Sequence, residues 1–412
     1  MDCEAFAELL SPRGQQALQA ATAAGLQEKN LLPDLERLRK VYGAGLARAA
    51  VEMALLRTRA AVKFGRAHEM YFTREALEQA SGERISRHRA QRFAGCVRVG
   101  DFGCGIGGDL VALAERTSVI GVERDAVRAA MATENLRVCG LHGRASVQAG
   151  DVAEGAWPDV TGVWCDPARR LNGKRIFSVR NYQPALPTVL EWQRRVPNLG
   201  VKLSPGVQRR EIAGLPAELE FISEGGALKE AVLWFGALRT TDARATLLPG
   251  GHTLTATPGA SAGTGPLLRY LYEPDPAVLR AGLVQTLAVM LGARKLDEDI
   301  AYLSSDTLCR TVFARAYEVD DALPFSLKAI RALLRERGVG SVVVKKRGSP
   351  LDVDEFAKAL RLSGNPDVER TVFLTHVEGR AWAAIGRPVK NASQVEASSG
   401  GTYDSQHSPQ LH

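Results

Sequence analysis

The sequence predicts an α/β protein: a parallel β-sheet wrapped by helices, with a helical domain before it and a smaller α/β domain after it. Residues 1–94 show helical periodicity with few Gly or Pro residues. Residues 95–239 alternate apolar strand-like runs with helical stretches, which predicts parallel strands joined by crossover helices. The Thr/Ala/Gly/Pro-rich segment 240–266 is expected to be a linker with at most a short strand or two, before a second α/β unit at 267–389. The polar tail 390–412 is expected to be disordered.

Composition limits the class of protein. The chain has 412 residues, enough for two or three domains, and 45% hydrophobic residues, enough for proper cores. No long apolar stretch and no signal pattern is present, so we expect a cytoplasmic protein with no membrane partner. Six scattered Cys residues without C-x-x-C pairs or a His cluster predict neither disulfides nor a metal site. The net charge of +7 does not by itself establish polyanion binding.

The first strand of the predicted sheet leads into a glycine-rich turn. The run VRVGDFGCGIGGDL, residues 97–110, is a short apolar strand that ends at Asp101 and continues into Gly103, Gly105, Gly107 and Gly108. Residues without Cβ accept positive φ and leave their amides uncovered, so this turn is expected to hold a ligand. The same glycines also fit the G-x-G-x-x-G pattern of a dinucleotide site.

Acidic residues at the strand ends discriminate between two cofactors. Asp101 would repel a pyrophosphate but attract the ammonium and sulfonium groups of S-adenosylmethionine. The second strand, residues 118–122, ends in Glu123, which suits the ribose hydroxyls of either cofactor. The third, residues 145–150, leads to Asp151, suited to the adenine amine, which only the methyl donor predicts.

A fourth apolar run, residues 162–165, ends in Asp166 and Pro167 at the sheet edge where open α/β sheets bind ligands. With these elements the chain resembles a class I S-adenosylmethionine-dependent methyltransferase. The resemblance implies a Rossmann-like sheet and a cofactor site made of Asp101, Gly103, Gly105, Gly107, Glu123, Asp151 and Asp166. The alternative for Glu123 and Asp151 is that they are merely polar strand ends.

The C-terminal unit carries its own resemblance. The strings VVVKKRGSPLDVDEFAKALRLSG and RTVFLTHVEGRAWAAIG are similar to the THUMP-like domain that ends a bacterial group of RNA methyltransferases. The methyltransferase half of that group carries D-P-A-R-R, K-x-S-P-G and E-x-G-x-x-K-E motifs, matched here at residues 166–170, 202–206 and 224–230. The resemblance implies an RNA substrate, either rRNA or tRNA, but not the target nucleotide.

Clustered cations favour the same class of substrate. Five of them follow Asp166 before the next acid, namely Arg169, Arg170, Lys174, Arg175 and Arg180. We expect Arg169, Arg170 and Lys202 to bind substrate, although arginines in such a loop can instead pair with acids elsewhere in the fold. A second set belongs to the C-terminal unit, and two basic surfaces suit a long polyanion: Lys328, Arg331, Arg335, Arg337, Lys345, Lys346 and Arg347.

The segment just before the glycine strand resembles the aromatic-Ser/Thr-x-Glu segment of cap trimethylguanosine synthases. By that resemblance Phe72 and Thr73 lie over the site, whereas ordinary helix capping at Thr73 is the alternative. Lys63, Arg87 and Arg89 either contact RNA phosphates or lie on a solvated helix face.

Asp166 is the predicted catalytic residue, because an acid at this strand end can orient an exocyclic amine or take a ring N–H proton. Ala168 and Arg169 replace the second proline and the aromatic residue typical of adenine-amine enzymes, which leaves guanine or another RNA acceptor more open. Cys165 and Cys309 are expected to be core residues, which disfavours a C5-pyrimidine mechanism. Two other functions remain: methylation of a small molecule or protein, and RNA binding without catalysis.

Overall fold

The computed structural model describes residues 1–25, 31–152, 157–171, 174–176 and 178–389. It divides into two compact units, Met1–Asp242 with Leu248–Gly251, and Ala243–Leu247 with His252–His412. The tail expected to be disordered lies outside the described residues. Within the described ranges, no helix is both long enough and apolar enough to cross a membrane.

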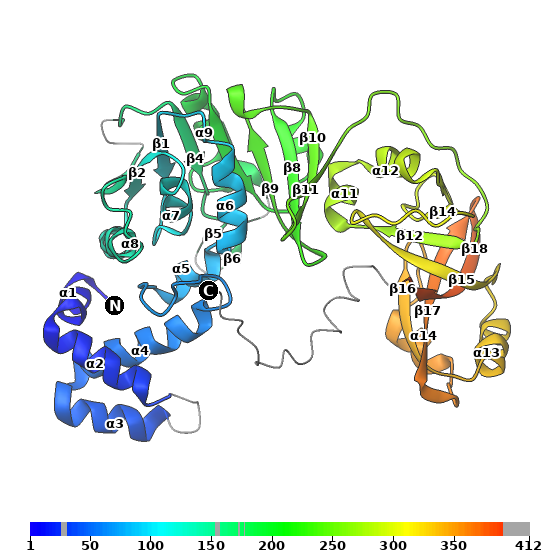
Figure 1. The fold of residues 1–412 in the computed structure, drawn as a ribbon, viewed down its shortest axis with the longest axis horizontal. Helices are drawn as coiled ribbons and strands as arrows, with labels where there is room; N and C mark the ends of the chain where they lie inside the picture. Colours follow the sequence, from blue (N-terminus) through cyan, green and yellow to red (C-terminus); the bar gives the residue numbers. More distant parts are fainter. Residues whose placement is uncertain (26–30, 153–156, 172–173, 177, 390–412) are drawn as a thin grey trace, which may run out of the picture. The chain divides into compact units, whose positions relative to one another are not determined.

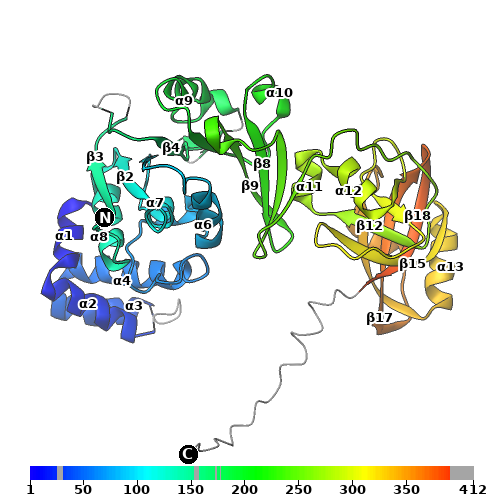
Figure 2. The ribbon, with the colours of Figure 1, turned by 45° about the horizontal axis from the view of Figure 1, so that its top comes forward.

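The first unit begins with six helices. Asp2 and Ser11 cap the first two through their side-chain oxygens, and Pro12 follows Ser11 at the first helical position, where its missing N–H costs nothing. The first four helices gather into one group in both views (Figures 1 and 2) and bury side chains such as Phe6, Leu18 and Met53 between them. The six are α1 (Cys3–Leu10), α2 (Pro12–Ala23), α3 (Leu31–Tyr42), α4 (Ala44–Ala60), α5 (Arg74–Gln79) and α6 (Glu83–Gln91).

Seven strands of the first unit follow one another in a sheet in the order β8-β9-β7-β4-β1-β2-β3. The five from β7 to β3 are parallel, and β9 and β8 are antiparallel additions. The central strands are buried and therefore rich in apolar residues. The seven are β1 (Arg98–Phe102), β2 (Ser118–Glu123), β3 (Ala145–Ala149), β4 (Gly162–Cys165), β7 (Leu199–Leu203), β8 (Glu218–Glu224) and β9 (Ala227–Trp234).

Helices connect these strands and confirm the predicted α/β architecture. Gly107, with a φ of +85°, precedes the first helix after the glycine turn, and Asp125 caps the next one through its side chain. The remaining elements of the unit are α7 (Gly108–Ala114), α8 (Ala126–Val138), the short hairpin β5 (Arg170–Leu171) and β6 (Lys174–Arg175), η2 (Val179–Asn181), α9 (Leu186–Gln193), α10 (Arg209–Ile212) and η3 (Gly236–Leu238).

The sheet order positions the ends of the first four parallel strands together. β1 lies between β2 and β4, with Phe102 beside Val122 on one side and Cys165 on the other, and β2 lies beside β3. Because parallel strands end at the same edge, the acids at their carboxyl ends meet there.

The segment expected to be a linker contains an antiparallel hairpin, β10 (Ala243–Leu248) and β11 (His252–Thr255). The alternating Ala243–Leu248 sequence, followed by Pro249, Gly250 and Gly251, explains the hairpin, since these residues form its turn.

The second unit contains a seven-stranded sheet in the order β13-β14-β12-β15-β18-β17-β16. The apolar runs at 341–344 and 370–374 lie within β16 and β17, which pair in parallel, and α14 lies between these two strands in the sequence. Its elements are β12 (Tyr270–Pro274), α11 (Pro276–Ala281), α12 (Val284–Leu291), β13 (Arg294–Lys295), β14 (Leu303–Ser305), β15 (Ala314–Pro324), α13 (Leu327–Glu336), β16 (Val339–Lys346), α14 (Val353–Ala359), β17 (Asn365–Val377) and β18 (Arg380–Pro388).

Candidate active site

A cavity of about 710 Å³ opens at the carboxyl edge of the parallel strands in the first unit. It brings together seven of the predicted site residues. The C-terminal end of α5 and the residues after it, among them Glu78 and Ser81, form another part of its lining. The seven predicted residues that line it are Asp101, Gly103, Gly105, Glu123, Asp151, Asp166 and Arg169.

The glycine turn forms one wall of the cavity. Gly103 and Gly105 have φ values of +81° and +57°, and a Cβ built on either one would meet nothing within 4 Å. The turn therefore leaves open space beside its backbone, as a closely held ligand requires. Gly107, also at positive φ, does not line the cavity, and a Cβ there would approach Ala132 at 3.4 Å. The φ and this packing explain glycine at 107.

Glu123 closes the turn from the neighbouring strand. Its buried carboxylate accepts hydrogen bonds from the amides of Gly105 at 2.9 Å and Asp125 at 2.9 Å, one on each oxygen. A carboxylate oxygen has further acceptor capacity, so this side chain can hold the loop and still accept a hydroxyl from the cavity.

Asp101 is the acid of the site whose buried carboxylate lacks a hydrogen-bond partner on one oxygen within the described part of the chain. Its side chain is buried, with a relative exposure of 1%, and its Oδ2 has no hydrogen-bond partner among the described residues. Burial, together with the nearby carboxylates of Asp109 and Asp166, raises the pKa of Asp101 well above its usual range. An orphaned carboxylate oxygen in a ligand cavity fits a cationic group, such as the ammonium of the cofactor predicted from the sequence.

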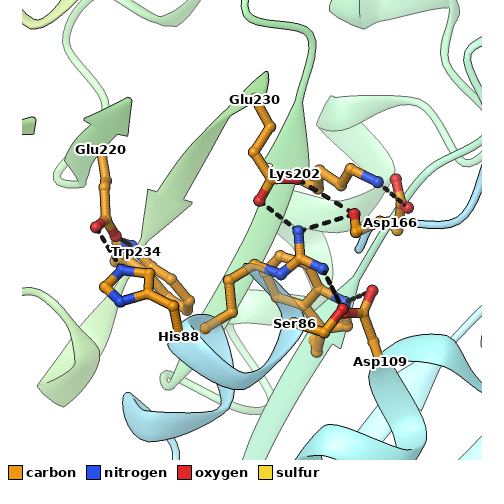
Figure 3. A network of polar contacts seen from close by, with 11 residues as sticks. Ser86, His88, Asp109, Asp166, Lys202, Glu220, Glu230 and Trp234 are labelled. Atoms are coloured by element: carbon orange, nitrogen blue, oxygen red, sulfur yellow. Dashed lines mark hydrogen bonds and ion pairs between the residues drawn. The ribbon is translucent and has the colours of Figure 1, made fainter. Parts of the chain in front are cut away.

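Asp109, in the first turn of α7, has the opposite environment. The guanidinium of Arg89 contacts Asp109, Glu230 and Ser86, three residues that Figure 3 labels, and stacks 4.7 Å from the ring centre of Trp164. Trp164 Nε1 also donates to Asp109 Oδ2 at 3.1 Å. Burial opposes ionisation of Asp109, but the positive charges of Arg89 and Lys202 outweigh it and lower the pKa of Asp109.

Asp166 lies directly after β4 and is also paired. Lys202 Nζ, from the adjacent strand β7, donates to Asp166 Oδ2 at 2.6 Å (Figure 3). Lys202 is buried and does not line the cavity, whereas Asp166 is partly exposed to it. The residue predicted to bind substrate directly therefore contacts the predicted catalytic acid instead.

Lys63 and Phe72 also lie elsewhere than the sequence comparison indicates. Lys63 Nζ donates to the carbonyl oxygens of Leu77 at 2.7 Å, Glu78 at 3.3 Å and Ala80 at 2.8 Å, so it holds the C-terminal end of α5. Burial and the positive charge of Lys202 lower the pKa of Lys63. The structure does not place this ammonium where it could contact a phosphate freely.

Phe72 is buried in the core beside Phe64, with ring centres 5.7 Å apart, and does not line the cavity. Thr73 Oγ1 accepts from the Ala76 amide at 3.1 Å, the capping alternative of the sequence analysis. Thr73 is the N-cap of α5, and residues of that helix line the cavity.

The other cations of the N-terminal segment are engaged as well. Arg87 pairs with Glu83 at 2.7 Å and with Glu115 at 2.8 Å. Arg89 is buried in the network described above, so neither the phosphate contact nor the solvated face expected for it is right. Its positive charge neutralises the buried carboxylates of Asp109 and Glu230.

The cationic segment after Asp166 is only partly described. Arg169 lines the cavity, and within the described residues it has no hydrogen-bond or ion-pair partner for its side chain. The side chains of Arg170, Lys174 and Arg175 lie outside the described part of the structure.

The second cationic set is largely engaged in contacts of its own unit. Arg337 pairs with Asp321 at 2.6 Å and Lys345 with Glu273 at 2.6 Å. Two further cations bind backbone carbonyl oxygens, since Arg331 donates to Ala359 and Lys346 donates to Leu351. The guanidinium of Arg347 lies over the ring of Tyr302. Lys328 and Arg335 are exposed on α13. This set therefore presents less free charge than its sequence suggests.

Sequence reasoning missed several residues that line the cavity, among them Asp109, Trp192 and Lys229. Lys229 was inside the E-x-G-x-x-K-E motif without a role assigned to it. It is exposed on β9 and has no side-chain partner among the described residues. The sequence also contained a signal for Asp109. An acid in the first turn of a helix that follows a glycine-rich loop lies at the helix N-terminus, beside the ligand that the loop holds.

Comparisons with known proteins identify the fold of the chain and two of its domain families. A family described as THUMP domain-like matches residues 314–388, and a domain family of unknown function, DUF8688, matches residues 2–60. A crystal structure of a proposed methyltransferase from Porphyromonas gingivalis superposes with a TM-score of 0.72 at 22% identity, over 89% of this chain and 100% of that chain. This likeness shows a shared fold.

Two Mycobacterium tuberculosis proteins, from two strains, are each 37% identical to the chain over 326 residues, which is 76% of this chain and 89% of theirs. Both are named as uncharacterized S-adenosylmethionine-dependent methyltransferases. The predicted cofactor, the Rossmann-like sheet and the C-terminal THUMP-like domain are thereby confirmed. The glycine turn, the strand-end acids and this degree of identity lead to one conclusion: the chain belongs to the family of S-adenosylmethionine-dependent methyltransferases.

Proposed function

We propose that this enzyme transfers the methyl group of S-adenosylmethionine to RNA. The observation that carries the proposal is a set of cations in the cavity lining, Arg124, Arg169 and Lys229, which have no side-chain partners among the described residues. A fourth lining cation, Arg128, is neutralised by Glu75 at 2.6 Å. Unpaired cations beside an acceptor acid suit a substrate that carries phosphates. The THUMP-like domain of the same chain supports this class of substrate.

In this proposal the cofactor lies along the strand-end acids. The orphaned oxygen of Asp101 accepts its ammonium, the open backbone at Gly103 and Gly105 admits its methionine part, and Glu123 and Asp151 accept from the ribose and the adenine amine. S-adenosylmethionine supplies a methyl group on a positively charged sulfur. The chain's own residues hold the acceptor atom in line with that group, which is the main source of rate in a displacement of this kind.

Asp166 is the residue we assign to the acceptor. It is the strand-end acid that follows β4, and the residues after it, Pro167 to Arg169, line the same cavity as Tyr182 and Pro205. Prolines and an aromatic ring exclude water from the reacting atoms, and Arg169 is placed to hold a flanking phosphate with its planar guanidinium. Phosphate contact and acceptor orientation are then provided by neighbouring residues of one segment.

The test is methyl transfer by the purified full-length protein from radiolabelled S-adenosylmethionine. The acceptors are in vitro transcribed rRNA and tRNA, free nucleosides and a soluble protein fraction. We expect label in RNA alone. Label in nucleosides or protein with none in RNA would refute the proposal.

A paired set of variants tests the role of the cavity cations. Removing two of the three, R169A with K229A, should weaken RNA binding and reduce the slope of log K against log salt by up to about 2, with cofactor affinity unchanged. The matched control is K40A, which removes an exposed lysine from α3, away from the cavity lining. An equal loss of RNA affinity in K40A would mean that the cavity cations have no special role.

A further inference from the structure

We infer that Lys202 is a positioning residue that holds Asp166 as a fixed hydrogen-bond acceptor, and that the methyl acceptor is therefore an exocyclic amine nitrogen of a nucleobase. The inference rests on the proposed RNA methyltransferase function and narrows it to one kind of acceptor atom. From the sequence, Asp166 has two possible roles: to orient an amine or to remove a ring proton. The contact with Lys202 favours the first.

The geometry places Lys202 behind Asp166 relative to the cavity. The two residues come from the ends of adjacent parallel strands, where Cys165 pairs with Val201. The Lys202 side chain is 3% exposed and that of Asp166 is 26% exposed, and the bond to Oδ2 at 2.6 Å is the one side-chain hydrogen bond that Lys202 makes within the described residues. Lys202 therefore contacts no substrate itself, and its direct contact with the lining is through Asp166.

The pairing assigns a different task to each oxygen of Asp166. Oδ2 is occupied by the ammonium, which leaves Oδ1 to accept an N–H from the cavity. If Asp166 took up a whole proton, the buried ammonium of Lys202 would lose its counter-charge, which is strongly unfavourable. Accepting a hydrogen bond leaves the ion pair intact.

This arrangement favours a nucleophile that attacks with its own lone pair. A hydroxyl acceptor needs a base to remove its proton, and a carbon acceptor needs a thiolate in the cavity. Cys104, which lines the cavity, does not provide one, because burial and the nearby carboxylates of Asp101 and Glu123 raise the pKa of its thiol well above the usual value. Cys165 does not line the cavity, and burial raises the pKa of its thiol as well. An amine bonded to Oδ1 through one N–H has its lone pair available for attack.

The step balances without a further reactant. The nitrogen lone pair forms the new N–C bond as the C–S bond breaks, and the electron pair of that bond stays on sulfur, which becomes a neutral thioether. The nitrogen then carries a positive charge and releases its extra proton to water. No protein residue changes its net protonation.

The experiment compares wild type, K202M, K202R and D166N in single-turnover methyl transfer to in vitro transcribed rRNA and tRNA, with the methylated nucleoside identified by mass spectrometry. We expect an exocyclic N-methyl product. K202M should lower the transfer rate by about 100-fold while the Kd for S-adenosylmethionine stays within about twofold, because a loosened acceptor acid is misaligned by fractions of an ångström. K202R, which can keep the ion pair, should recover at least about tenfold of that loss.

Two further measurements separate positioning from structural support. Because Lys202 acts through Asp166, the effect of K202M should largely disappear when it is made in D166N, whereas rate losses that multiply would overturn the inference. The control is K295M, which removes another largely buried lysine, bonded to the carbonyl oxygen of Glu298 in the second unit, and should leave the rate unchanged. If K202M is unfolded by circular dichroism, the comparison of K202R with D166N tests the inference: both should fold, and D166N should lose more of the rate than K202R.

The identity of the methylated nucleoside tests the acceptor atom separately from the proposed RNA methyltransferase function. A product methylated on a ring nitrogen, an oxygen or a carbon in RNA would refute the exocyclic amine acceptor while leaving the RNA methyltransferase function standing. A wild-type protein that binds S-adenosylmethionine and methylates no RNA would refute both.

Discussion

Replacing Asp101 by Asn should make the cofactor-free protein more stable and make the cofactor bind more weakly. Asp101 is buried beside Asp109 and Asp166, its Oδ2 is unpartnered among the described residues, and burial with these neighbours raises its pKa. A buried polar group left unsatisfied costs about 1–3 kcal/mol. At about 2–4 °C per kcal/mol for a domain of this size, D101N should raise Tm by at least about 2 °C at pH 7.

The same substitution removes the negative charge proposed to hold the cofactor ammonium. A hydrogen bond to a charged group contributes about 1.5–3 kcal/mol, so the Kd for S-adenosylmethionine should rise about 10- to 150-fold by calorimetric titration. Stability and affinity should therefore change in opposite directions, as expected where a site is built for its ligand rather than for the empty fold.

D109N is the matched control, because it makes the same chemical change at another acid of the same cavity, in the opposite environment. Asp109 is paired with Arg89 and bonded to Trp164, and its pKa is lowered. Removing one partner of a buried pair costs about 3–5 kcal/mol, so D109N should lower Tm by about 6 °C or more.

The pH dependence of the two variants follows from the signs of the pKa shifts. The raised pKa of Asp101 means that its protonated form stabilises the fold below the unfolded pKa near 3.9, and that this stabilisation is lost as pH rises through the folded pKa. The lowered pKa of Asp109 means that its contribution is present above about 3.9 and is lost at lower pH. The Tm difference of D101N should thus shrink on acidification from pH 7 to pH 4, whereas that of D109N should persist over this range and shrink only below about pH 3.9. A D101N protein that melts below wild type at pH 7, or that binds S-adenosylmethionine as tightly, would refute this reasoning.

Three other substitutions test separate parts of the cavity. G105V should keep the fold but raise the Kd for S-adenosylmethionine at least tenfold, because φ at this position is +57° and the new side chain enters the space left for the ligand; unchanged affinity in calorimetry would place the cofactor elsewhere. K63M frees three carbonyl oxygens at the end of α5 and should lower the free energy of unfolding by about 1–3 kcal/mol in urea titrations, whereas loss of RNA binding at unchanged stability would restore the phosphate-contact role. W192F should remove most of the change in tryptophan fluorescence on cofactor addition, since Trp192 lines the cavity; a signal of full size in W192F would show that a different indole reports binding.

The acids at the strand ends could be predicted because their positions depend on the neighbouring sequence alone. Each acid follows a short apolar run, and the edge of a parallel sheet brings such residues together whatever the details of packing. Asp101, Glu123 and Asp166 could therefore be placed from the sequence, and all three line the cavity. The glycines were predictable for the same reason, since the turn requires positive φ at fixed offsets from the strand.

Side-chain direction was not predictable in the same way. Lys202 sits in a motif next to the sheet edge, but which neighbour its ammonium reaches depends on β7 lying beside β4, and Asp166 is 36 residues away. Phe72 and Lys63 precede the site in sequence and pack behind it in space. Their residue types fit a binding wall and a structural role equally well, so only the tertiary contacts discriminate.

The uneven compensation of the acids suggests why the site is arranged as it is. Arg89 neutralises Asp109 and Glu230, Lys202 contacts Asp166, and the amides of Gly105 and Asp125 bind Glu123. Asp101 alone among these acids has a buried oxygen without a partner in the described part of the chain. A fold selected for stability alone would not keep that carboxylate, because it costs free energy in the empty protein. It is explained if its counter-charge arrives with the cofactor, so the acid that destabilises the empty site is the one from which cofactor binding gains most.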